Sequence, residues 1–159
     1  MINNMEMAEG RLGRVVAVRL KPGTDVLLGL TEACRNYNIK NGVILSAIGS
    51  LDGVRYCDIV ELPDKAAGCG YGEVLHLSGL IELTSATGII CHEAETGEIN
   101  LHIHINLSDR YGNGYGGHLV EGTLVKMTVD VVMAEIEGIR MERQWNEELE
   151  VPLFAPKQG

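Results

Sequence analysis

The 159-residue sequence contains no apolar run of the roughly 20 residues that a membrane-spanning helix needs. Its first ten residues, MINNMEMAEG, lack the basic stretch followed by an apolar stretch that marks a secretory signal peptide. It also lacks repeats and low-complexity tracts. We therefore expect a cytoplasmic protein without membrane association, folded as a single domain over residues 1–159.

The chain has no CxxC pair, because its four cysteines are widely separated: Cys34, Cys57, Cys69 and Cys91. In a reducing compartment, cysteines spaced in this way are typical of free, half-buried thiols rather than of disulfides.

Positive charge is also scarce, since 13 basic residues face 22 acidic ones and the formal net charge is −9. Such a surface repels nucleic acid and anionic lipid at long range. A weak basic cluster near the start (Arg11, Arg14, Arg19 and Lys21) fits a solvated strand with alternating charges better than a nucleic-acid site. We expect no useful DNA binding by this chain alone.

One helix is expected, over residues 24–38, with Thr24 or Asp25 as its N-cap. Apolar residues recur at helical spacing and form one face; they are Val26, Leu27, Leu30, Ala33, Cys34 and Tyr37. Asn38 and Asn41-Gly42 both suit the helix exit.

The rest of the sequence reads almost entirely as strand, beginning with residues 10–23. We expect a turn at Leu51-Asp52-Gly53, a long strand bent or bulged at Gly79, a hairpin turn at Glu95-Thr96-Gly97 and a loop over 61–72. The tail, 146–159, should be an extended edge with a frayed end. The pattern predicts an α+β fold with a twisted, mainly antiparallel sheet of about seven strands and one main helix.

Apolar and polar residues alternate along the segment INLHIHINL, and this pattern predicts which face of the strand its histidines occupy. Side chains alternate between faces along a strand, so Leu101, Ile103 and Ile105 face the core while His102 and His104 face the other way. Two imidazoles two residues apart on one face lie roughly 6–7 Å apart, as twice the strand rise. Such a pair is half of a possible metal site.

The other half can come from His118, which follows the glycine-rich loop SDRYGNGYGG. Glycines allow the backbone to fold back closely, so a strand starting at His118 can return beside the HxH strand. Three neutral imidazoles suit zinc first, and also nickel, copper or ferrous iron. Three protein ligands leave a coordination position open, which is typical of a catalytic site.

A plainer interpretation remains open, in which His102 and His104 form a polar outer face and His118 is a hydrogen-bonded turn residue. His76 and His92 each stand alone in an apolar strand and fit satisfied core or interface residues better than ligands, although His92 can support the metal site indirectly. The loop glycines have only Arg110 beside them and precede a strand, which argues against a nucleotide site.

Three stretches resemble the plants-and-prokaryotes conserved (PPC) domain family. The segment from Glu73 to Gly79 is similar to its Glu-Ile-Leu-x-Leu-x-Gly strand, and His102, His104 and Asp109 to its His-x-His and polar loop. Its Gly-Gly-His-Leu follows at Gly116–Leu119, and AIGSLDGVRY resembles its Ile-Gly-Ser turn. The resemblance covers about residues 14–145, where we place the domain core.

The resemblance implies an α+β fold, a homotrimer and, as in prokaryotic members, a metal on the three histidines. The apolar segment VDVVMAEI (129–136) adds a reason to expect assembly, because a lone domain struggles to cover it. Plant members contact DNA through a separate AT-hook with an Arg-Gly-Arg-Pro core. Here EGRLGRVV places Leu12 inside that motif and has no proline, so the DNA-reading part is missing.

Two functional classes follow. The first is a metal-dependent hydrolase or lyase of a small molecule, with a carboxylate as base; Glu73 is the catalytic candidate because it matches the family strand, with Glu121 and Asp109 behind it. The second is a DNA-binding, regulatory or scaffold protein whose metal is structural or sensory. The sequence names no substrate.

Overall fold

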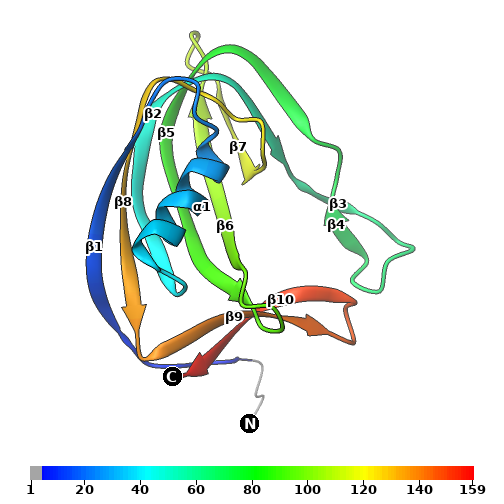
Figure 1. The fold of residues 1–159 in the computed structure, drawn as a ribbon. Helices are drawn as coiled ribbons and strands as arrows, with labels where there is room; N and C mark the ends of the chain where they lie inside the picture. Colours follow the sequence, from blue (N-terminus) through cyan, green and yellow to red (C-terminus); the bar gives the residue numbers. More distant parts are fainter. Residues whose placement is uncertain (1–4) are drawn as a thin grey trace.

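Ten strands and one helix make up the computed structural model, which describes residues 5–159 (Figure 1). Residues 1–4, part of the segment on which the absence of a signal peptide was inferred, lie outside the described residues. The elements are β1 (Arg11–Leu20), α1 (Val26–Tyr37), β2 (Gly42–Cys57), β3 (Ile59–Glu61), β4 (Cys69–Tyr71), β5 (Leu75–Glu93), β6 (Ile99–Ser108), β7 (Gly114–Leu119), β8 (Val125–Glu137), β9 (Ile139–Asn146) and β10 (Val151–Gln158).

Eight strands form one curved sheet in the order β1-β8-β2-β7-β6-β5-β9-β10, and β2 also pairs with β5. Every pairing in this sheet is antiparallel except the short parallel contact of β5 with β9, where His92 pairs with Glu142. The predicted α+β class with a mainly antiparallel sheet and one helix is confirmed, although the strands are more numerous than expected.

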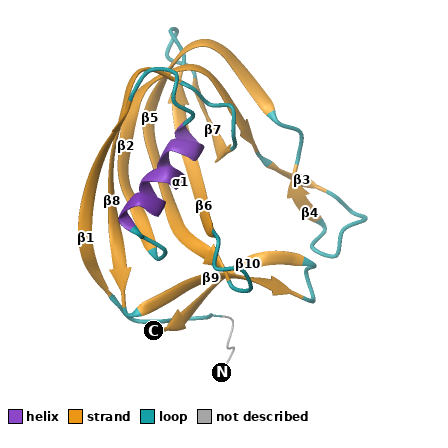
Figure 2. Ribbon diagram, in the orientation of Figure 1, coloured by secondary structure: helices purple, strands orange, loops and turns teal. Residues whose placement is uncertain are grey.

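Helix α1, drawn in purple in Figure 2, starts and ends where its sequence predicts. Asp25 is the N-cap and accepts a hydrogen bond from the Leu28 backbone N–H at 3.0 Å, while Asn38 closes the helix in the left-handed conformation at φ 52°. Val26, Leu30 and Cys34 are its buried residues. Tyr37 lies at the exposed end of the predicted apolar face, where nothing covers it fully.

The core lies between α1 and the inner face of the sheet (Figure 1). Leu30, Ile44 and Met133 are each at most 1% exposed. Burying a side chain of this size contributes about 1.5–3 kcal/mol. Side chains that point to the other face of the sheet are left free to build a site.

One expected strand boundary is wrong, because β2 is continuous from Gly42 to Cys57. The expected turn at Leu51-Asp52-Gly53 is a bulge within β2, where the register with β5 shifts between Asp52 and Val54. Gly53 takes φ 82° there, so the glycine that suggested a turn instead lets a long strand curve. Gly79 takes φ 86° on the partner strand, where the expected irregularity within one long strand is confirmed.

The segment expected as a loop over 61–72 contains most of a two-stranded ribbon. β3 pairs antiparallel with β4, and the ribbon projects from the body of the sheet (Figure 1). The tail is an edge strand as expected, but its end is paired: β10 follows β9 from Val151 to Gln158. Gln158 also donates to the Gly138 carbonyl at 2.8 Å, which holds the end in place.

The charged and sulfur-containing residues agree with the sequence interpretation. Arg11 and Arg14 of β1 pair with Glu137 and Glu135 of β8 at 2.8 Å each, so the weak basic cluster is in part neutralised along the sheet. All four cysteines are free thiols. Within residues 5–159, no helix combines the length and apolar character required to cross a membrane.

Candidate metal centre

Strand β6 alternates as its sequence predicts. Leu101, Ile103 and Ile105 are buried, while His102 and His104 project from the opposite face of the sheet. In the pairing with β5, His102 lies opposite Ile89 and His104 opposite Thr87. The apolar half of the strand therefore fixes the direction of both imidazoles.

The third histidine arrives on β7, which starts at Gly114 rather than at His118. The glycines expected as a loop are themselves the strand, and they pair with β6 up to His118, which lies directly opposite His104. A Cβ on Gly117 would lie 2.7 Å from the Tyr56 ring and 2.9 Å from the Cys57 carbonyl oxygen. Glycine is therefore required for β7 to lie between β2 and β6.

The three histidines come together as predicted. His102 Nε2 lies 3.1 Å from His104 Nε2, and one ligand atom from each of the three rings lies within 4.8 Å of the others. Neighbouring ligands on a tetrahedral zinc lie about 3.3 Å apart, given Zn–N bonds of about 2.0–2.1 Å. The donor set therefore fits a divalent transition metal after small side-chain adjustments, and zinc suits three imidazoles well.

Electrostatics favours the neutral, ligating form of two of these imidazoles. The pKa of His118 is lowered to about 4, first because burial disfavours the charged ring and then because His102, His104 and Arg143 contribute nearby positive charge. The pKa of His102 is lowered by burial first, followed by His104 and Arg143. Both rings can therefore bind a cation at neutral pH without first losing a proton.

Tyr71, at the end of β4, joins the cluster and was missed by the sequence interpretation. Its hydroxyl lies 3.0 Å from His118 Nδ1 and 3.3 Å from His102 Nε2, and its ring stacks on His118 with centroids 4.4 Å apart. Burial, more than the nearby Cys57, raises the pKa of Tyr71, so the hydroxyl keeps its proton at neutral pH. A three-residue strand has no periodicity, so no sequence signal marks this tyrosine.

The carboxylate candidates occupy three different settings. Glu73 is exposed in the bend between β4 and β5, two residues after Tyr71. Glu121 lines a hollow of about 410 Å³ together with His118. Asp109 instead holds the β6–β7 turn, since its carboxylate accepts from the backbone N–H groups of Tyr111 and Asn113 at 2.8 and 2.9 Å. Hydrogen bonds, chiefly from the Asn113 side chain, lower the pKa of Asp109.

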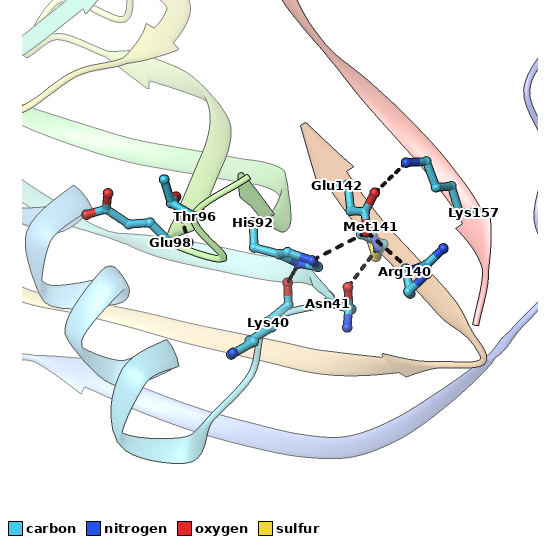
Figure 3. Close-up of polar contacts among 9 residues, drawn as sticks. All are labelled: Lys40, Asn41, His92, Thr96, Glu98, Arg140, Met141, Glu142 and Lys157. Atoms are coloured by element: carbon cyan, nitrogen blue, oxygen red, sulfur yellow. Dashed lines mark hydrogen bonds and ion pairs between the residues drawn. The ribbon is translucent and has the colours of Figure 1, made fainter. Parts of the chain in front are cut away.

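His92 lies in a separate polar cluster (Figure 3). Its Nδ1 is 3.4 Å from the Lys40 carbonyl oxygen and its Nε2 is 3.9 Å from Glu142, a buried carboxylate that Lys157 contacts at 2.7 Å. The alternative in which His92 supports the metal site is therefore wrong. His76 is exposed on β5 and is not a member of the three-histidine group.

Residues 7–137 match the family described as the Plants and Prokaryotes Conserved (PCC) domain. The chain belongs to this family. Over 131 residues, 82% of the chain, it is also 30% identical to the bifunctional protein GlmU of two Synechococcus strains. The match spans only 18% of the length of GlmU, so it relates this PCC domain to a small part of that protein.

Solved structures share the fold along nearly the whole chain. A plant- and prokaryote-conserved protein from Pyrococcus horikoshii is 26% identical, with all of both chains covered and a TM-score of 0.77. A metal-containing protein from Archaeoglobus fulgidus is 24% identical, covering 94% of this chain and 99% of that one, with a TM-score of 0.78. A candidate DNA-binding protein from Bacteroides thetaiotaomicron is 20% identical, with 95% and 97% covered and a TM-score of 0.72.

Proposed function

We propose that this PCC-domain protein is a homotrimeric, metal-dependent hydrolase or lyase of a small molecule, with His102, His104 and His118 holding one divalent transition metal, zinc first. The observation that carries the proposal is the convergence of three imidazoles, within 4.8 Å, from two adjacent strands. Three protein ligands leave room for a water or substrate. The metal-containing neighbour from Archaeoglobus supports the choice of a metal.

When bound, zinc supplies a Lewis acid and lowers the pKa of a coordinated water to about 7. The chain's own residues supply the rest of the site. The protonated Tyr71 hydroxyl, which reaches His102 and His118 in this structure, is placed to donate a hydrogen bond to an oxygen of the substrate. Its ring, stacked on His118, keeps that imidazole in orientation.

Glu73 is our proposed general base, and Glu121 is the competing candidate because it shares a hollow with His118. Glu73→Gln and Glu121→Gln distinguish them. Removing the base should lower kcat by about 100-fold or more while the bound metal is retained, since general base catalysis contributes typically 10²–10⁴-fold. The other variant serves as the control, and loss of metal in either would indicate a different role.

The apolar segment 129–136 does not itself favour assembly. Most of the apolar segment 129–136 is buried, since Val129, Val131 and Met133 are at most 2% exposed. Apolar side chains are instead exposed on the outer face of the sheet, where Leu45, Ile48, Leu80 and Val132 are 48%, 53%, 64% and 37% exposed. A second copy covering these side chains would remove them from water, which favours association.

The proposed place of action is the cytoplasm, and the four free thiols agree with a reducing compartment. The alternative is a DNA-binding, regulatory or scaffold protein with a structural or sensory metal. The Bacteroides neighbour favours that alternative by its name, whereas the net charge of −9 does not.

The experiment that tests the enzymatic proposal compares zinc-loaded wild type with His104→Ala on 4-nitrophenyl acetate and on a panel of small esters and lactones. We expect turnover by the wild type well above that of the variant and of free zinc. Equal rates in all three, with metal bound to the wild type, would assign the metal a structural or sensory role instead.

A further inference from the structure

A pocket of about 580 Å³ lies beside the histidines. Its walls come from the β3–β4 ribbon, from β5 and β6, and from the β9–β10 hairpin, and His102 lies in its lining. Most of the lining is apolar, including Ile89 and Phe154. Its volume is in the range of pockets that bind small molecules, about 300–1,000 Å³.

Arg143 is the one formally charged residue in this lining. Its guanidinium donates to the Asn100 side-chain oxygen at 3.1 Å and to the Pro152 carbonyl at 3.2 Å, both of which are neutral acceptors. Among the described residues it forms no ion pair with a carboxylate within 4.0 Å. A guanidinium has five N–H donors, so donors remain available to a ligand.

Arg143 and His102 line the same pocket, so the guanidinium and one candidate metal ligand face one space. A cation in a mostly apolar lining is unusual in a chain of net charge −9, and such a lining screens its field poorly. Arginine recognises carboxylates by paired, parallel N–H···O bonds.

We propose that this pocket binds a small monocarboxylate with an apolar body. Its carboxylate pairs with Arg143, its apolar body lies along Ile89 and Phe154, and its far end points to His102. The inference names the substrate class of the proposed metalloenzyme and rests on that function, but the binding step itself needs no metal. One cation in a mostly apolar lining fits a single negative charge on an apolar molecule better than a polyanion.

The test uses metal-free protein and two matched probes, 4-phenylbutyrate and its neutral amide, with affinities measured by isothermal titration calorimetry. We expect wild type to bind the acid at least tenfold more tightly than the amide. Arg143→Gln should reduce the affinity for the acid to that for the amide. Arg143→Lys should keep part of the preference for the acid over the amide. Arg140→Gln is the matched control, because it removes the same charge from the same strand outside the pocket lining.

The location of the binding site is tested by Ala67→Trp, which fills the pocket from the β3–β4 ribbon and leaves Arg143 in place. This substitution should lower the affinities for the acid and the amide alike. Thermal unfolding by circular dichroism checks that each variant folds. If Arg143→Gln does not fold, Arg143→Lys and Ala67→Trp decide the matter, and an unchanged acid preference in Arg143→Lys together with unchanged affinities in Ala67→Trp would overturn the proposal.

Measuring acid binding with and without zinc distinguishes a failure of this inference from a failure of the proposed metalloenzyme function. Acid binding that requires zinc, survives Arg143→Gln and disappears in His104→Ala would place the carboxylate on the metal and overturn the inference. The absence of acid binding at millimolar concentration would overturn it too, as expected if a second copy fills the pocket. Binding with the Arg143 dependence in a protein that takes up no zinc would support the pocket and reject the metalloenzyme.

Discussion

His104 and His118 lie directly opposite each other where β6 pairs with β7. A single antiparallel register therefore sets the position of two of the three candidate ligands, and the two-residue spacing within β6 sets the third. A site built on paired strands keeps its geometry without the metal, because ladder hydrogen bonds and buried side chains on the opposite face hold both strands.

His104→Ala should reduce bound zinc from one per chain to near zero after dialysis, with little change in thermal stability. The side chain projects from the outer face, so its removal leaves the buried Ile103 and Ile105 untouched. Elemental analysis measures the metal. His76→Ala, also an exposed histidine, should keep its zinc. Metal-free wild type after zinc supplementation would end the proposal, and metal retained in His104→Ala would move the site elsewhere.

Metal-free protein should lose stability as the pH falls from about 6.5 towards 4. The unfolded chain takes up protons on His102 and His118 near the usual pKa of about 6.5, whereas the native state does so only at the lowered pKa, about 4 for His118. Because the unfolded state then binds more protons than the native state, the free energy of unfolding must decrease as the pH decreases through this window.

Urea unfolding of chelator-treated protein at pH 7.5, 6.5, 5.5 and 5.0 measures this slope. His118→Gln is the comparison, since it cannot take up the proton and should lose less stability over the same range. Identical slopes for wild type and variant would contradict the lowered pKa of His118.

Gly117→Ala should destabilise the protein by about 1–3 kcal/mol, the usual cost of forcing an extra group into a packed site. The added Cβ would meet the Tyr56 ring, the Cys57 carbonyl oxygen and the Asp58 carboxylate. Gly114→Ala is a matched control on the same strand, because a Cβ there has no heavy atom within 4 Å. Chemical denaturation of both variants compares them, and equal stabilities would show that β7 has room to shift.

The native mass should be about 52 kDa, three times the 17.3 kDa of one chain. Ile48 and Leu80 are more than half exposed on the outer face of the sheet, and association removes such side chains from water. Light scattering coupled to size exclusion measures the mass. Ile48→Glu should weaken the assembly, whereas Leu12→Glu, equally exposed on the edge strand β1, should not. A monomer at micromolar concentration would reject the trimer.

Duplex DNA should bind only weakly and without sequence preference at physiological salt. A trimer carries roughly three times the charge of −9, and electrostatic affinity for DNA depends on lysines and arginines that displace counterions from phosphates. Fluorescence anisotropy with labelled duplex measures the affinity. A sub-micromolar complex that weakens steeply with added salt would contradict this expectation.

The features that the sequence predicted well depend on local periodicity. Asp25 and Asn38 bound the helix at the expected places, and alternation in β6 gave the directions of His102 and His104. The glycine-rich segment predicted that the chain turns back and places His118 beside this pair. The glycines form part of strand β7 itself and not only the turn before it. These features need only the sequence near them, together with one antiparallel pairing.

Features set by contacts between distant residues escaped prediction. The tripeptide Leu51-Asp52-Gly53 contains residues typical of a turn, yet pairing with β5 makes it a bulge within β2. Tyr71 and Arg143 meet the histidines through tertiary structure, from a three-residue strand and from a hairpin near the end of the chain. No spacing between these residues along the sequence indicates that they surround one pocket.

Asp25 has a further consequence for how the molecule folds. One of its carboxylate oxygens caps α1 at Leu28, and the other accepts a hydrogen bond from the Gly122 backbone N–H at 2.6 Å, just after the strand that carries His118. Both carboxylate oxygens are therefore engaged only when Gly122, 97 residues further along the chain, has reached the start of the helix. In native-state hydrogen exchange, the amides of Leu28 and Gly122 should open in one cooperative event, which couples helix α1 to the segment that follows β7.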